Sequence, residues 1–275
     1  MHRSDSRLLV AVACCVAWFL PSLAGRLPAV EPESSDAARA AYASAAALQN
    51  REAWDLAAEE WQTLIQRHPQ DPRAFKARDS LAICQLKRGD QWPAASKTLR
   101  DVISGPADEA TKALARWELG RGMFVAAQAN PSAEAWTAAA TSLREFLEKS
   151  PGQPQAADAA HFLGEALWQA GKRPEAIATW SRFVTDHPDA PRLADVLYAL
   201  GVGQAETGSR AEAAATLERF ARSFPTHKLA PDVALWRADL ALAADQPAVA
   251  ETVLAPVLSG TGARAAEALD RLGTA

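Results

Sequence analysis

Residues 155–188, QAADAAHFLGEALWQAGKRPEAIATWSRFVTDHP, contain the pattern that decides the fold. Apolar side chains recur three and four residues apart in the first half, as on one helix face: Ala160, Leu163 and Leu167. Gly171 follows this helix and Pro174 opens the next one, which is the usual placement of these residues at helix ends. Pro188 ends the second helix, because the residue before a proline is pushed out of the helical conformation. The stretch therefore predicts a helical hairpin.

The same pattern recurs along the chain with a period of about 37 residues. Prolines at the ends of the expected hairpins are 37, 45, 37 and 37 residues apart: Pro69, Pro106, Pro151, Pro188 and Pro225. An alanine stands 12 residues before each of them, and another follows in the next register: Ala57, Ala94, Ala139, Ala176, Ala213 and Ala250. Mostly large side chains stand 8 residues before the prolines: Trp61, Thr98, Leu143, Trp180 and Leu217. A fixed period of this length indicates stacked hairpins, each burying its apolar face against the next.

Two glycines, Gly164 and Gly201, lie inside expected helices at the same point of the repeat. Glycine inside a helix costs about 0.5–1 kcal/mol relative to alanine, so its repeated use indicates a close neighbour. We expect a neighbouring backbone to need the space, with Ala176 and Ala213 at the facing helix crossing.

These residues resemble the tetratricopeptide repeat, a family with a small residue in the first helix, then alanine, a large side chain and proline in the second. Two series follow the pattern position for position: Gly164, Ala176, Trp180 and Pro188, then Gly201, Ala213, Leu217 and Pro225. The resemblance covers residues 36–275 and implies an all-α solenoid of about six antiparallel hairpins, wound into a right-handed superhelix. The period of 37 is similar to that of bacterial cell-envelope members, such as Tol–Pal-associated proteins and outer-membrane assembly lipoproteins.

The third hairpin, about residues 107–151, is longer than the others by seven or eight residues. About one extra turn in each helix keeps both apolar faces in phase, with Asn130-Pro131-Ser132 at the tip. Residues 25–35 form a polar lead-in, after which Asp36 is placed to cap the first helix. A final helix at 263–272 either caps the array or starts a further repeat of a longer chain.

Residues 1–24 have the features of a secretory signal peptide. A basic start with Arg3 and Arg7 precedes an apolar run of 13 residues, Leu8–Leu20, which is too short to span a membrane. The small residues Ser22 and Ala24, at the third and first positions before the cut, then predict cleavage after Ala24. An uncleaved membrane anchor is the alternative. Either reading places the domain outside the cytoplasm, in the periplasm or cell envelope.

Composition and cysteine count exclude several classes of protein. Of 275 residues, 49% are hydrophobic and 23% charged, with a net charge of −4, so nucleic acid is not an expected main partner. Cys14 and Cys15 do not fit a lipid-attachment site, because the apolar run continues after them. Cys84 then remains alone, so no intrachain disulfide forms, and its apolar neighbours indicate a packed thiol.

The sequence contains no pattern typical of catalysis, metal binding or cofactor binding. No His-x-x-x-His, Cys-x-x-Cys or Gly-x-Ser-x-Gly spacing occurs in the expected repeats. Four histidines follow the signal segment, and two of them, His68 and His187, stand directly before prolines at expected helix ends. We therefore expect a protein that is not an enzyme and holds no metal or cofactor.

A binding surface is expected on the concave wall that the first helices of the hairpins form. By analogy with the family, the positions facing this groove are Trp117, Arg121, Phe124, His161, Glu165, Trp168, Asp195, Tyr198 and Asp239. Aromatic side chains with acidic neighbours suit an extended or helical peptide that carries apolar and some basic side chains. The alternative is that half of these aromatic side chains belong to the core between repeats.

The sequence therefore favours an exported, non-catalytic scaffold or adaptor that binds other envelope proteins or peptides. A second hypothesis is an accessory helical domain of a larger cell-envelope enzyme, similar to the superhelix of a lytic transglycosylase. In that case the catalytic part is not in this chain.

Overall fold

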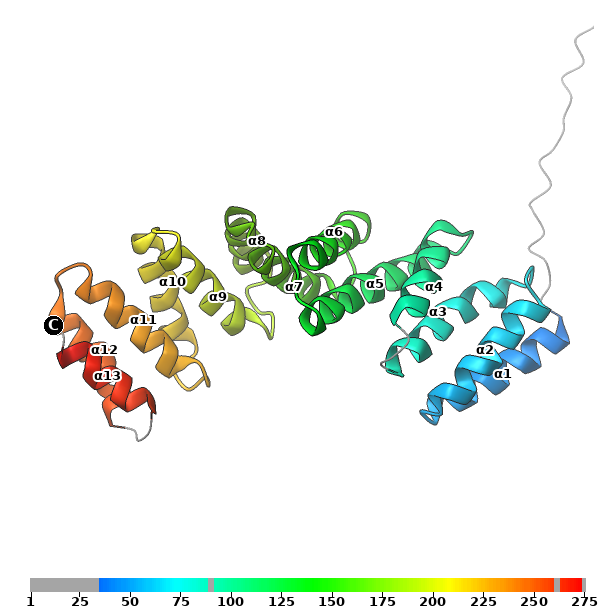
Figure 1. The fold of residues 1–275 in the computed structure, drawn as a ribbon, viewed down its shortest axis with the longest axis horizontal. Coiled ribbons are helices and arrows are strands. Elements are labelled where there is room, and N and C mark those ends of the chain that lie inside the picture. Colours follow the sequence, from blue (N-terminus) through cyan, green and yellow to red (C-terminus); the bar gives the residue numbers. More distant parts are fainter. Residues whose placement is uncertain (1–34, 89–91, 260–262, 274–275) are drawn as a thin grey trace, which may run out of the picture. The chain divides into compact units, whose positions relative to one another are not determined.

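The computed structural model describes residues 35–88, 92–259 and 263–273, and over these ranges the chain folds into α-helices joined by short turns (Figure 1). The helices are α1 (Asp36–Asn50), α2 (Trp54–Arg67), α3 (Pro72–Lys87), α4 (Trp92–Ser104), α5 (Glu109–Ala129), α6 (Ala133–Lys149), α7 (Ala156–Gln169), α8 (Arg173–Asp186), α9 (Leu193–Glu206), α10 (Arg210–Ser223), α11 (Ala230–Leu242), α12 (Pro247–Leu258) and α13 (Ala263–Gly273). The predicted signal peptide, and the lead-in up to residue 34, lie outside the described residues.

Successive helices pair into six hairpins, which we number from α1–α2 to α11–α12, and α13 follows the sixth. Each helix packs against the next, and the first helices of most neighbouring hairpins also contact one another. Of these first-helix pairs, α7 and α9 make the least contact. The fold is therefore the solenoid of helical hairpins that the periodicity predicts, with one wider gap between the first helices of hairpins four and five.

Side-chain caps begin several of these helices. Ser35 rather than Asp36 caps α1, because its hydroxyl accepts a hydrogen bond from the backbone N–H of Ala38 at 3.1 Å. Asp108 and Ser132 cap α5 and α6 in the same way. The two helices of the third hairpin therefore start where a short polar side chain can bind a free backbone N–H.

The repeated alanines form the tightly packed points of five hairpins. They are completely buried: Ala57, Ala139, Ala176, Ala213 and Ala250. In the second hairpin the prediction is one residue off, since Ala94 is partly exposed and Ala95 is buried instead. Leu99 is likewise buried where the period pointed to Thr98. This hairpin therefore packs in a register shifted by one residue.

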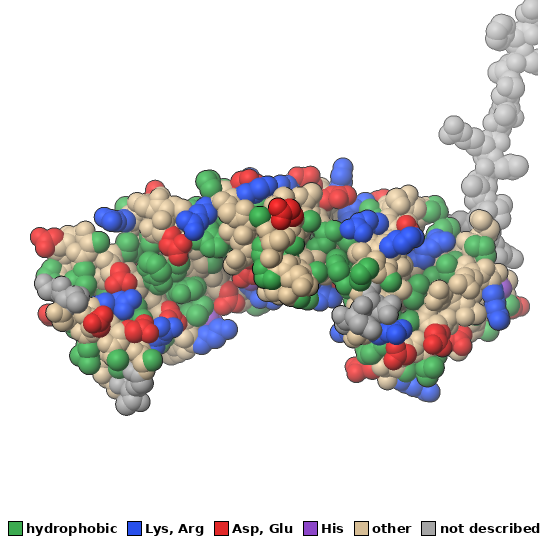
Figure 2. Space-filling model, in the orientation of Figure 1, with side chains coloured by type: hydrophobic (Ala, Val, Ile, Leu, Met, Phe, Trp, Pro, Cys, Tyr) green, Lys and Arg blue, Asp and Glu red, His purple; other side chains and the backbone are tan. Residues whose placement is uncertain are grey.

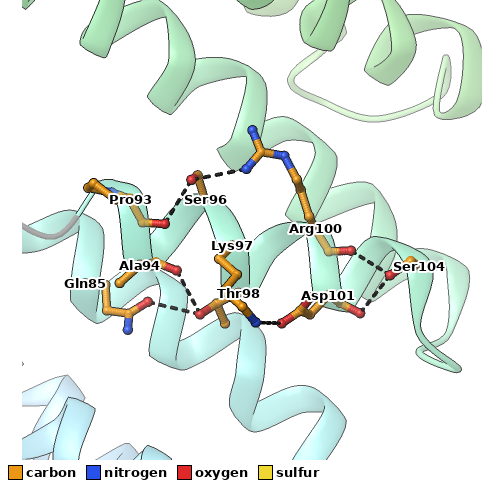
Figure 3. A network of polar contacts seen from close by, with 9 residues as sticks. All are labelled: Gln85, Pro93, Ala94, Ser96, Lys97, Thr98, Arg100, Asp101 and Ser104. Carbon is orange, nitrogen blue, oxygen red and sulfur yellow. Dashed lines mark hydrogen bonds and ion pairs between the residues drawn. The ribbon is translucent and has the colours of Figure 1, made fainter.

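Thr98 makes polar contacts in that hairpin and does not fill an apolar packing position. Its hydroxyl lies 3.2 Å from the side-chain oxygen of Gln85 in α3, and 3.0 Å from the backbone oxygen of Ala94 (Figure 3). Lys97 and Asp101 form an ion pair of 2.7 Å on the same helix. A polar contact thus joins α3 and α4 at a point where other hairpins use a large apolar side chain.

The glycines at the repeated position make room for side chains, which corrects the expectation of a close backbone. A Cβ atom on Gly164 would lie 2.1 Å from Nε1 of Trp180, and one on Gly201 would lie 2.6 Å from Leu217. Gly120 of the third hairpin faces Leu143 in the same manner, at 2.9 Å. In hairpins three to five, the large side chain of the second helix is therefore seated directly on a glycine of its own first helix.

The additional residues of the third hairpin are divided unequally between its helices. α5 has 21 residues and α6 has 17, whereas α7 and α8 have 14 each. The expected equal lengthening is therefore wrong, because most of the extra length is in α5. Asn130 ends α5 and Ser132 caps α6, so the tip lies at the expected Asn-Pro-Ser segment.

Candidate functional site

A groove of about 700 Å³ lies between the first helices of hairpins three to five, α5, α7 and α9. It coincides with the wider gap between α7 and α9. Of the nine positions predicted from the sequence, these seven line it: Arg121, Phe124, His161, Glu165, Trp168, Asp195 and Tyr198. The repeat register thus brings side chains from three hairpins, up to 77 residues apart in the chain, to one surface.

Two predicted positions lie elsewhere. Trp117 is only 8% exposed, and its ring packs against those of Phe146 and Phe162 at 5.8 and 6.1 Å. Asp239 accepts hydrogen bonds of 2.7 and 3.1 Å from Arg271, because α13 packs over this part of α11. Trp117 is therefore a core residue, and Asp239 anchors the last helix.

The groove has a buried aromatic base. Phe124 is 4% exposed and packs edge-on against Trp136 of α6 at 5.4 Å. The partly exposed ring of Phe162 lies 4.8 Å from Phe124. Trp136 and Phe162 were not predicted as groove residues, because the family pattern marks only the positions of the first helices that face the groove. Trp117 and Phe124 thus belong to the core, as the alternative interpretation held.

Trp168 and Tyr198 are partly exposed at the sides of the groove. The ring of Trp168 lies 5.8 Å from that of Trp180 and rests near Gly203, where a Cβ atom would come within 3.2 Å. The guanidinium of Arg173 lies 4.9 Å from the centre of the Trp168 ring, a favourable cation–π arrangement. Burial raises the pKa of Tyr198, and the charge of Asp232 adds to this shift, so its hydroxyl stays protonated near neutral pH.

His161 is the most deeply buried polar side chain of the groove, at 5% exposure. Its Nε2 lies 3.3 Å from the Glu165 carboxylate, and its Nδ1 has no hydrogen-bond partner. A buried ring nitrogen without a partner is costly, by about 1–3 kcal/mol. The groove lining therefore contains a buried ring nitrogen without a hydrogen-bond partner.

Arginines from two elements contribute positive charge. Arg121 forms an ion pair of 2.6 Å with Glu118 on its own helix. Arg192, which precedes α9, pairs with Asp158 and places its guanidinium 5.1 Å from the centre of the Phe162 ring. Arg192 lies in a joint between repeats, where the sequence pattern carried no signal for a groove residue. On the face shown in Figure 2, Lys and Arg side chains are interspersed with Asp and Glu among hydrophobic patches.

Two features of the described residues concern metal-ligand clusters and reactive side chains. In this part of the chain no three His, Cys, Asp or Glu side chains come together as metal ligands. Burial raises the pKa of the Cys84 thiol to about 11, which disfavours the reactive thiolate. None of the described helices is long and apolar enough to cross a membrane.

Comparison with known proteins agrees with the fold. The family model for the tetratricopeptide repeat matches residues 163–190 and 195–227, within hairpins four and five. A search of curated protein sequences gave no match.

Solved structures similar to this one include three repeat proteins. MamA from Desulfovibrio magneticus RS-1 is 15% identical, with 71% of this chain and 99% of that chain covered and a TM-score of 0.56. YrrB, described as a tetratricopeptide-repeat protein with an unusual peptide-binding site, is 16% identical, with coverage of 78% and 94% and a TM-score of 0.54. PilF from Pseudomonas aeruginosa is 14% identical, with coverage of 87% and 98% and a TM-score of 0.53. At these identities the likeness concerns the fold.

The hairpin period, the glycine-seated side chains, the two matched repeats and the similar folds lead to one conclusion. Hairpins four and five match the tetratricopeptide-repeat model, and the described chain shares the fold of solved tetratricopeptide-repeat proteins.

Proposed function

We propose that this protein is a non-catalytic scaffold or adaptor that binds other proteins of the bacterial cell envelope. A peptide segment of the partner lies in the groove between α5, α7 and α9. Tetratricopeptide-repeat proteins bind other proteins or peptides, so the fold supports the general function. The observation that carries the proposal for this chain is the set of partly exposed aromatic side chains beside carboxylates in one groove.

The chemistry of the groove indicates the kind of peptide. Trp168 and Tyr198 offer large, rigid apolar surfaces, which favour burial of apolar side chains with little loss of conformational freedom. The carboxylates of Glu165 and Asp195 also line the groove and add negative charge to it. An extended or helical segment with apolar and basic side chains fits this surface.

A capture experiment with matched variants tests the groove. The chain from residue 25 is immobilised and incubated with bacterial envelope extract, and bound proteins are identified by mass spectrometry. We expect the Trp168→Ala/Tyr198→Ala variant to lose partners that the wild type captures. Leu56→Ala and Leu269→Ala remove exposed apolar side chains outside the groove, so they serve as controls. Equal capture by all four proteins would contradict the groove assignment, provided that circular dichroism shows all of them folded.

Export is a separate part of the proposal. It rests on the basic start, the short apolar run and the small residues before position 25. Mass spectrometry of the chain expressed in a bacterial host is expected to find it outside the cytoplasm, with Gly25 as its first residue. An intact Met1 terminus in the cytosolic fraction would remove the argument for the envelope.

A further inference from the structure

Three aspartates occupy the same place in successive hairpins. Asp158, Asp195 and Asp232 lie in the first turns of α7, α9 and α11, each 37 residues from the next. A carboxylate in the first turn stabilises a helix through the partial positive charge of its free N–H groups. This role is common to all three, so any further difference between them has to come from their neighbours.

Two of these aspartates hold an arginine from the following repeat. The Asp158 carboxylate accepts from Nε of Arg192, the residue that caps α9, at 2.5 Å. The Asp232 carboxylate lies 2.5 Å from a guanidinium nitrogen of Arg264 at the start of α13. Both ion pairs thus join the first turn of one first helix to the beginning of the next first helix.

The aspartate between them has no such arginine. Leu229 caps α11, so it stands where Arg192 stands before α9. No Lys, Arg or His of the described residues lies within ion-pair distance of Asp195, although exposed Lys228 also lines the groove. At Asp195 the repeat therefore has the carboxylate of this ion pair but not its cation. This carboxylate belongs to the groove lining.

A second unused polar atom lies in the same groove. His161 is 95% buried, and its Nδ1 has no partner, whereas its Nε2 faces Glu165. When Nε2 carries the proton and donates to Glu165, Nδ1 is an acceptor. The accessible polar group of this wall is therefore the Asp195 carboxylate, which calls for a hydrogen-bond donor on the ligand, whereas Nδ1 of His161 is buried behind the surface.

We propose that Asp195 binds an arginine side chain of the partner peptide in the groove. The partner's arginine takes the position that Arg192 and Arg264 take beside the other two aspartates. Arginine fits better than lysine, because its planar guanidinium can give a carboxylate two parallel hydrogen bonds. This inference rests on the proposed function, since it assigns the basic side chain of a peptide that the groove is proposed to bind.

The test uses a random twelve-residue peptide library displayed on phage and selected on the chain from residue 25. The strongest selected peptide is synthesised twice, once as selected and once with its arginine replaced by alanine. Both are titrated against the wild type and three variants. Asp195→Asn removes the charge, Leu229→Arg supplies the missing internal cation, and Asp189→Asn removes an exposed carboxylate outside the groove.

We expect the selected peptides to share an arginine, whose removal weakens binding to the wild type about five- to tenfold, as for a partly exposed charge-assisted hydrogen bond. The same removal should have little effect on binding to Asp195→Asn, and Leu229→Arg should weaken the arginine peptide by a similar factor. Asp189→Asn should behave as the wild type. Such coupling between the two partners identifies a direct interaction.

Other outcomes separate the inference from the function on which it rests. Selected peptides that bind without a shared arginine, or whose arginine shows no coupling to Asp195, would overturn the inference and leave the proposed function intact. A shared lysine would overturn the preference for arginine. A library that yields no binding peptide would contradict the proposed function and the inference together.

Discussion

The first and fourth hairpins, α1–α2 and α7–α8, bury the same kind of side chain but differ in its hydrogen bonding. Each buries a tryptophan from its second helix, Trp61 and Trp180, which are 1% and 3% exposed. Nε1 of Trp61 donates a hydrogen bond of 2.8 Å to the side-chain oxygen of Gln49. In α7–α8 the residue at the place of Gln49 is Trp168, and Nε1 of Trp180 has no partner.

The difference identifies a repeat whose own residues do not satisfy a buried hydrogen-bond donor. A glutamine at this point closes the first hairpin with a polar contact, and in the fifth hairpin Gln204, one residue before the equivalent position, accepts a hydrogen bond from Thr216 at 2.8 Å. Trp168 cannot accept this hydrogen bond, and its ring instead forms part of the groove. Departures from local consistency of this kind are expected at functional sites. We infer that hairpin four gives up some stability to present an aromatic side chain to a partner.

The largest expected effect concerns what both hairpins share. Ala57 and Ala176 are completely buried at the helix crossing, so Ala57→Trp and Ala176→Trp should each lower the free energy of unfolding by about 3 kcal/mol or prevent folding. Ala178 is exposed two residues further on, and Ala178→Trp should change it by less than about 0.5 kcal/mol. Urea unfolding midpoints measure all three. Equal shifts at 176 and 178 would mean that the helix register is wrong.

The next effect separates the two hairpins. Trp61→Phe leaves the oxygen of Gln49 without its indole donor, whereas Trp180→Phe removes a donor that has no partner. Both substitutions create a similar space, so their difference isolates the hydrogen bond. We expect Trp61→Phe to be more destabilising by about 1–2 kcal/mol in thermal or urea unfolding. A larger loss for Trp180→Phe would contradict this account of the two hairpins.

A third prediction concerns the pH dependence of folding stability. It involves a residue of α3, the helix that follows the first hairpin. Burial, and secondarily the charge of Glu118, raises the pKa of Asp79 from 3.8 to about 6, and its Oδ1 has no hydrogen-bond partner. Because the folded-state pKa is the higher one, the favourable contribution of the protonated carboxyl is complete below pH 4 and is lost as the pH rises through 6.

Asp79→Asn should therefore stabilise the protein at pH 7.5, by an amount on the order of 1 kcal/mol, and the gain should vanish at pH 3.5. Thermal melts of variant and wild type at the two pH values measure it. A gain of the same size at both would show that the carboxyl does not change its protonation in this range.

The smallest expected effect is that of introducing the polar contact of the first hairpin into the fourth. Trp168→Gln places an acceptor where α1 has Gln49, whereas Trp168→Leu does not. We expect the glutamine variant to be more stable than the leucine variant by about 0.5–1 kcal/mol, and both to lose peptide binding. A more stable leucine variant would show that the orphan N–H of Trp180 is of little consequence.

The sequence predicted the hairpins because proline, alanine and large side chains recur where close packing allows few alternatives. It failed where a side chain satisfies a local contact instead: Thr98 binds Gln85, so the packed positions of α4 move by one residue. Trp117 shares its helix with true groove residues, but the neighbouring rings of Phe146 and Phe162 bury it. Arg192 lies in the segment between two repeats. Its ion pair with Asp158 holds it beside the groove, and no repeat pattern predicts this pair.

Site-specific photo-cross-linking tests the central claim, that the groove between α5, α7 and α9 binds the partner. A photoreactive amino acid replaces Val125 or Val202, which line the groove, or Ala178 or Ala214, which line other surfaces. The four proteins are expressed in bacteria and irradiated in intact cells. Our account predicts that the same partner is cross-linked from positions 125 and 202 and not from 178 and 214. Cross-links from 178 or 214, with none from the groove, would contradict it.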